Sequence, residues 1–174
     1  MGKIELFDIK KDYDLIIQRV KEQYGYDDNL SNTLRKILPA MLTGRSYEER
    51  NLFYKMLTKT PIIVLPKDGD IRETSKKMFE GLNKNIINEN KETSSWKPEG
   101  LFSSELIFDD QLNVVGKKQA LFIKTLDGIK SLTESQRKRM ELFGTGLEVS
   151  HLIHELGHAW VSEKINILEM IEET

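Results

Sequence analysis

The chain of 174 residues contains no cysteine. Disulfide bonds and thiolate metal ligands are therefore excluded, so a bound metal would have to be held by His, Asp or Glu. Residues 1–6 include charged side chains and lack the apolar run of a signal peptide, and no stretch reaches the roughly 20 apolar residues of a membrane span. We therefore expect a soluble protein that is either cytoplasmic or exported without a classical signal peptide.

An excess of charge of one sign is also missing. Lys and Arg total 26, Asp and Glu total 28, and the formal net charge is -2. This balance disfavours nucleic acid and anionic membrane surfaces as partners. The chain also lacks a glycine-rich phosphate loop, a serine nucleophile elbow and the basic-aromatic pattern of single-strand binding proteins.

The residues that are present suit one globular domain spanning 1–174, because 39% are hydrophobic and 31% are charged. Hydrophobic periodicity predicts an α+β fold with a mostly helical N-terminal half and a small antiparallel sheet. A polar stretch from about residue 83 to 100 is predicted to be a long mobile loop. Expected helices lie around residues 15–25, 31–44, 46–60, 71–82 and 133–143, and expected strands at 62–65, 105–108, 112–115 and 120–123, the last three forming a meander.

One further helix carries the chemistry. The capping-box pattern of Thr145 and Glu148 predicts that this helix starts near residue 145. Steps of 100° along residues 149–161 separate an apolar side, which we expect to be buried, from a side rich in His and Glu. The apolar side holds Val149, Leu152, Ile153, Leu156 and Trp160, and the other side holds His151, His154, Glu155 and His158.

The spacing of His154 and His158 predicts a metal site. Residues four apart lie one above the other on a helix, so both imidazoles can bind one ion, and neutral imidazole suits Zn²⁺. Glu155 projects to the side of this pair, where it can take a proton from a water molecule activated by the ion. Gly157 inside a helix costs about 1 kcal/mol relative to Ala, which favours a functional reason for its presence.

His151 lies on the same side but is not expected to be a ligand. It is two turns from His158, with a rise of about 10 Å, so both can hardly share an ion with His154. We expect His151 to line the cleft or to support a ligand.

The sequence His154-Glu155-Leu156-Gly157-His158 resembles the signature of the zincin metallopeptidases. The resemblance implies zinc as cofactor, peptide-bond hydrolysis with Glu155 as general base, and a protein or peptide substrate. Residues 159–164 lack the Gly and third His of the metzincin branch, whereas the gluzincin branch takes its third ligand from a Glu on a following helix. A break near residues 164–166 would let the C-terminal segment return as such a helix. Glu163 is too close on the same helix to fold back, and we expect it to be solvated.

Residues 145–174 are also similar to the metallopeptidase effectors that bacteria inject into host cells, which implies a toxin or effector role. On that resemblance Glu172 is the expected third ligand, with Glu173 and Glu169 as alternatives. Zincins also use a transition-state donor such as Tyr, His or Arg downstream of this ligand, and only Thr174 remains here. Either the natural chain continues, or the domain is compact, or the donor lies upstream.

The resemblance further implies an antiparallel edge strand that binds the substrate backbone, and residues 119–125 are the candidate. Two other functions stay open. One is a non-enzymatic interaction protein or pseudo-peptidase that retains only the helix. The other is a regulatory, repressor-cleaving metallopeptidase, in which the active helix follows the strand more closely. The oligomeric state is left open.

Overall fold

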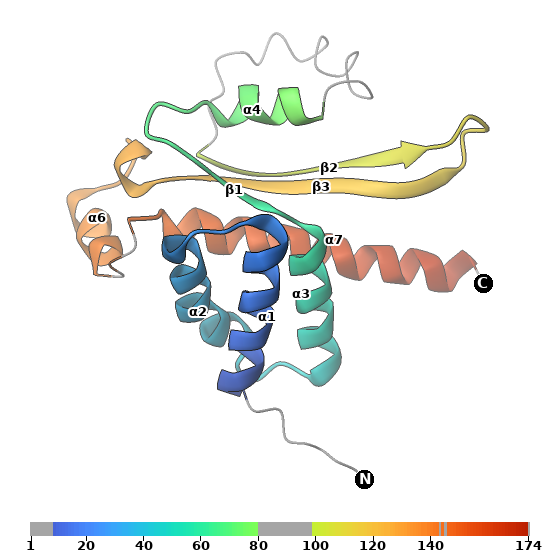
Figure 1. Cartoon of the computed structure of the whole chain (residues 1–174), viewed down its shortest axis with the longest axis horizontal. Coiled ribbons are helices and arrows are strands. Elements are labelled where there is room, and N and C mark those ends of the chain that lie inside the picture. The colour runs from blue at the N-terminus through green and yellow to red at the C-terminus, as the bar shows by residue number, and fades with distance from the viewer. Residues whose placement is uncertain (1–8, 80–98, 143, 145, 174) are drawn as a thin grey trace.

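The computed structural model describes the backbone of residues 9–79, 99–142, 144 and 146–173, and the side chains of residues 13–79, 99–142, 144 and 146–165. Helices and a small sheet build an α+β fold, as the sequence predicts (Figure 1). The mobile loop predicted at 83–100 lies almost wholly outside the described residues. At its end, Gly100 is already the first residue of a strand.

Three helices precede the sheet: α1 (Ile9–Tyr24), α2 (Asp28–Leu42) and α3 (Tyr47–Lys59). Gly25 follows α1 with φ +72°, as its predicted role as a stop requires. The side chain of Ser46 accepts a hydrogen bond from the Glu49 N–H and caps α3, also as predicted. Helix α2 begins three residues before the expected Ser31, because the Asp27 carboxylate caps it.

The sheet has three strands in the order β1 (Ile62–Leu65), β3 (Val114–Lys124), β2 (Gly100–Phe108). Strand β2 pairs with β3 in antiparallel fashion, and β1 pairs with β3 in parallel. The sheet is therefore mixed rather than antiparallel, because the chain between β1 and β3 crosses over through α4 (Ile71–Met78) and β2.

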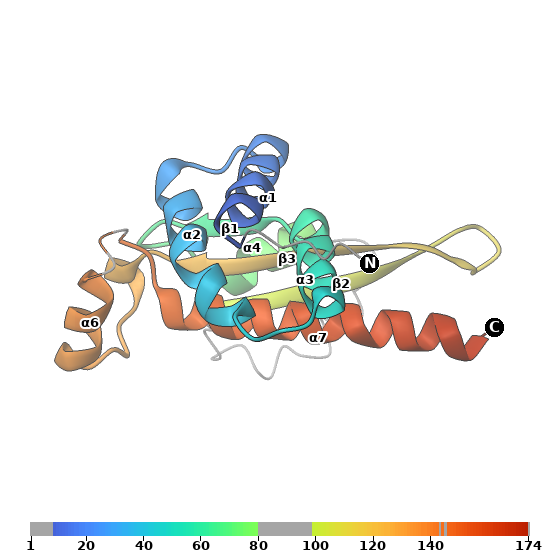
Figure 2. The same cartoon turned by 90° about the horizontal axis from the view of Figure 1, so that it is seen from below.

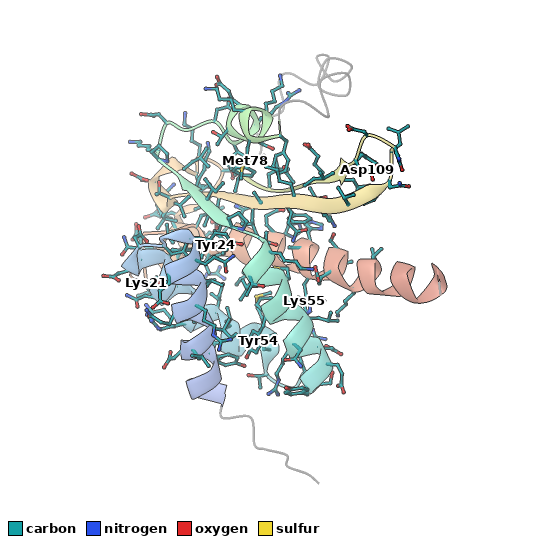
Figure 3. The ribbon with its side chains drawn as sticks, turned by 45° about the vertical axis from the view of Figure 1, so that its right-hand side comes forward. Lys21, Tyr24, Tyr54, Lys55, Met78 and Asp109 are labelled. Atoms are coloured by element: carbon teal, nitrogen blue, oxygen red, sulfur yellow. The ribbon has the colours of Figure 1, made fainter. Side chains whose placement is uncertain are left out.

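The predicted three-strand meander is wrong, since its last two strands are one. Strand β3 runs without interruption through the expected turn at residues 116–118. Lys118 pairs there with Glu105 of β2, and its Nζ donates to the carbonyl oxygen of Met78. The turn lies earlier, where Leu112 has φ +64°. The result is one long hairpin with Asp109 near its tip (Figure 3).

Alternating side chains of β3 supply two separate hydrophobic clusters, one on each side of the sheet. Leu121 and Ile123 pack with the side of the sheet that faces α1–α3 and the C-terminal helix. Ala120 and Phe122 pack with residues of α4 on the other side. Figure 1 shows α4 on one side of the sheet and the other long helices opposite, and Figure 3 places Met78 and Tyr24 on these two sides.

After β3 the chain forms a 3₁₀ turn, η2 (Leu126–Gly128), and helix α6 (Glu134–Glu141). Thr133 and Gln136 form a complete capping box at the start of α6, as the sequence predicts. The last helix, α7 (Val149–Glu173), lies alongside the hairpin in both views (Figures 1 and 2).

Replacing Leu121 by Ala tests the larger cluster. Leu121 is fully buried between the sheet and the helices, so the Leu121→Ala variant should lose about 2–5 kcal/mol of unfolding free energy. Urea denaturation followed by circular dichroism measures the loss. Leu142→Ala is the control, because Leu142 is 85% exposed, and it should change stability by no more than about 0.5 kcal/mol.

Candidate metal centre

The start of α7 differs from the prediction. The helix begins at Val149 rather than near residue 145, and Thr145 lies outside the described residues. Leu147 instead forms a β-bridge with Thr125. Glu148 takes the capping role, because its carboxylate accepts hydrogen bonds from the backbone N–H groups of Ser150 and His151 at 3.2 and 2.6 Å.

One side of α7 is buried, which confirms most of the predicted apolar side. Its buried members belong to the larger hydrophobic cluster and include Val149, Leu152, Leu156, Ala159 and Trp160. Ile153 was also predicted to be buried but is 37% exposed. It lies about 60° or more beyond the buried residues around the helix, so the buried side is narrower than expected.

The opposite side of α7 brings the predicted site residues together. Potential ligand atoms of His154, Glu155 and His158 all lie within 4.8 Å of one another. The Nε2 atoms of the two histidines are 2.9 Å apart, and both side chains are exposed. Among the described side chains, no further His, Asp or Glu belongs to this group.

Glu155 occupies a different environment from the two histidines. Its side chain is only 8% exposed, and it lies between α7 and the start of β2. A Cβ atom placed on Gly100 would lie 3.4 Å from Cγ of Glu155 and 3.0 Å from Cβ of His151. Glycine at position 100 therefore allows the strand to approach the helix at this point.

The two histidines fit the donor set of a zinc ion. An ion bound tetrahedrally at 2.0–2.1 Å from each Nε2 needs these atoms about 3.3 Å apart. The observed 2.9 Å separation requires an opening of only a few tenths of an ångström. No cysteine competes, and imidazole nitrogen is a preferred zinc ligand.

His151 lies on this side of α7, as predicted, and is tied to Glu148. Its Nδ1 contacts the Glu148 carboxylate at 2.5 Å, and this carboxylate is fully buried. The contact with Glu148 raises the pKa of His151 above its ordinary value of 6.5, against the opposing effect of burial, and the carboxylates of Glu99 and Glu155 add to the rise. Burial alone would raise the pKa of Glu148, but the hydrogen bonds from His151 and Ser150 outweigh it and hold the pKa below 4.5.

The third-ligand prediction depended on a break near residues 164–166, and no break is present. Helix α7 is continuous to Glu173 (Figure 1). The backbone of residue 172 consequently lies about 21 Å along the helix from that of His158. The side chains of Glu169, Glu172 and Glu173 lie outside the described residues, so their assignment as ligands stays a prediction without the expected fold-back to support it.

Glu163 is buried rather than solvated, which corrects another expectation. Its carboxylate is 3% exposed and contacts Nζ of Lys59 at 3.1 Å. It lies on the buried side of α7 that packs against α3, because it follows Leu156 by seven residues, or two turns. Its role is to join two helices and not to hold the candidate metal.

The predicted edge strand at 119–125 is also wrong. Strand β3 is the central strand, with β1 and β2 on either side, so its backbone has no free edge. Strand β2 is the edge strand nearest the site, because Gly100 contacts the helix turn of His151 and Glu155. Sequence reasoning missed Gly100 because it stands at the end of a polar stretch that has the composition of a loop.

No protein-family model, no curated protein and no solved structure matches this chain. The likeness to zincins therefore depends on the residues of α7 alone. Within the part of the chain that the structure describes, none of the helices has the length and apolar character that crossing a bilayer requires.

The ion pair of Glu148 and His151 should make stability depend on pH. The lowered pKa of Glu148 contributes stability above about pH 4.5 that is lost as pH falls through its folded-state pKa. The raised pKa of His151 contributes stability below about pH 6.5 that is lost as pH rises through its folded-state pKa. Glu148→Gln should therefore cost most between these values, on the order of 1–3 kcal/mol.

Urea denaturation of metal-free protein at a series of pH values measures this dependence. Chelator removes the separate effect of metal binding on proton uptake. Glu99→Gln is the control for the other nearby carboxylate, and it should cost less, because Glu99 affects His151 only at a distance. A loss in Glu148→Gln that stays constant from pH 4 to 8 would contradict an ionised pair.

Proposed function

We propose that this chain is a zinc-dependent metallopeptidase of the zincin type. The observation that carries the proposal is the grouping of His154, Glu155 and His158 within 4.8 Å on the solvent-facing side of a helix whose other side is buried. Burial of the opposite side gives these residues a rigid support, which a site for catalysis needs.

Each residue of the group has a separate role. His154 and His158 supply two imidazole ligands. A zinc ion held there would polarise a peptide carbonyl and lower the pKa of a water molecule toward 7. Glu155 is held between α7 and β2, where it accepts the proton of the attacking water and passes it to the leaving amine.

Strand β2 supports the choice of a polypeptide as substrate. It is an edge strand that begins beside Glu155, so its free backbone groups can pair with an extended chain that crosses the site. Small substrates would gain little from such an edge. The proposed reaction is therefore hydrolysis of a peptide bond within a polypeptide.

A second candidate function is a metal-binding interaction protein or pseudo-peptidase without hydrolytic activity. It is favoured by one observation, that only two imidazoles besides Glu155 join the group among the described side chains. The repressor-cleaving class receives less support, because η2 and α6 stand between β3 and the active helix.

Metal content and cleavage together test the two candidates. Purified protein dialysed without chelator should contain about one zinc per chain by elemental mass spectrometry, and His154→Ala should lose it. Zinc-loaded wild-type protein should cleave denatured casein, and Glu155→Gln should keep zinc but lose at least about 100-fold in rate. Full zinc occupancy without cleavage would instead favour the interaction protein.

Substitution of Gly100 tests the role of the β2 start. In Gly100→Val the new side chain meets His151 and Glu155, so the strand and the general base are displaced. The rate of casein cleavage should fall, by as much as about 100-fold, while zinc content stays unchanged. Gly116→Val is the matched control in the partner strand, since a Cβ there finds no atom closer than 3.7 Å. Equal rates in the two variants would contradict the assigned role.

A further inference from the structure

The side of α7 that carries the two histidines continues beyond them as an apolar surface. Val161 and Ile165 follow His158 by three and seven residues, so all three share one side of the helix. Their side chains are 53% and 48% exposed, which is high for large apolar residues beside a candidate site. They lie about 4.5 and 10 Å farther along the helix axis than His158.

The hairpin contributes a third exposed apolar residue at the same level. Nζ of Lys117 in β3 donates to Oγ of Ser162 in α7 at 2.7 Å, which joins the hairpin to the helix at this turn. Leu106 of β2 is the cross-strand partner of Lys117, and directly opposed residues share one side of a sheet. Leu106 therefore lies on the side that faces α7, and it is 47% exposed.

Gly157 keeps the approach between the metal ligands and this surface open. It precedes Val161 by one turn, and a Cβ at this position would meet no atom within 4 Å. A substrate chain can therefore lie close to the helix between His154 and Val161. This placement offers a packing reason for a glycine that costs helix stability.

We infer that Leu106, Val161 and Ile165 form an apolar subsite that takes one bulky apolar side chain of an extended polypeptide substrate. The inference depends on the proposed function and adds a substrate class to it. An extended polypeptide is the occupant because the subsite adjoins both the candidate metal ligands and the free edge of β2. At about 3.3 Å per residue of extended chain, the selected side chain lies two or three residues from the cleaved bond, always on the same side of it.

The first measurement is binding, so that it does not depend on hydrolysis. The zinc-loaded Glu155→Gln protein is titrated with fluorescent ten-residue peptides of Ala and Ser that carry one Leu at successive positions. Peptides with Leu at the favoured positions should bind about tenfold more tightly than a peptide without Leu. Adding Val161→Gln and Ile165→Gln should remove this difference. Glutamine is chosen because it keeps helix propensity.

The matched control is Leu15→Gln with Leu142→Gln. These are also exposed apolar residues, on α1 and at the end of α6, and the tenfold preference should survive their replacement. Leu106→Thr is a second, independent variant that suits a β-strand and should also weaken the preference. It keeps the test decisive if the double variant of α7 fails to fold.

The second measurement is cleavage of a peptide library from digested denatured protein by the zinc-loaded wild type. A bulky apolar residue should be enriched two or three positions from the cleaved bond, and Val161→Gln with Ile165→Gln should remove the enrichment. Equal binding of peptides with and without Leu, or a preference unchanged in the variants, would overturn the subsite. Absence of cleavage with intact Leu-dependent binding would overturn the proposed function and leave the subsite standing.

Discussion

Helix α7 packs along one side against α3 and the sheet, and the rest of the candidate site depends on this packing. Residues such as Leu152 and Leu156 are fully buried there, and the ion pair of Glu163 with Lys59 joins α7 to α3 on the same side. A helix held in this way cannot rotate about its axis without exposing large apolar side chains to water. His154 and His158, on the other side, are therefore fixed in the direction they face.

Two residues outside the HExxH motif set the environment of this helix. Glu148 is fully buried and binds the first backbone N–H groups of α7 together with His151, so it fixes both the start of the helix and the orientation of that histidine. Gly100 lets β2 approach α7 closely enough to cover Glu155. The general base is thereby shielded from water while the two histidines stay accessible, which is the difference in environment that their proposed roles need.

Much of the helical part of the fold was predictable from the sequence, because its signals are local. Ser46 and Thr133 cap helices by contacts within four residues, and Gly25 ends a helix through its own backbone conformation. The errors fall where distant residues compete with local signals. Gly116 suggested a turn, yet pairing with β2 keeps it in a strand, and Thr145 suggested a cap that Glu148 provides instead.

The sequence by itself determined that His154 and His158 come together, because residues four apart on a helix are neighbours whatever surrounds them. It also determined the exclusion of thiolate ligands, since the chain has no cysteine. Only the tertiary structure decided that β2 rather than β3 is the edge beside the site, and that Leu106 lies level with Ser162 of α7. These features depend on strand order and on packing between segments far apart in the chain, which local spacing does not encode.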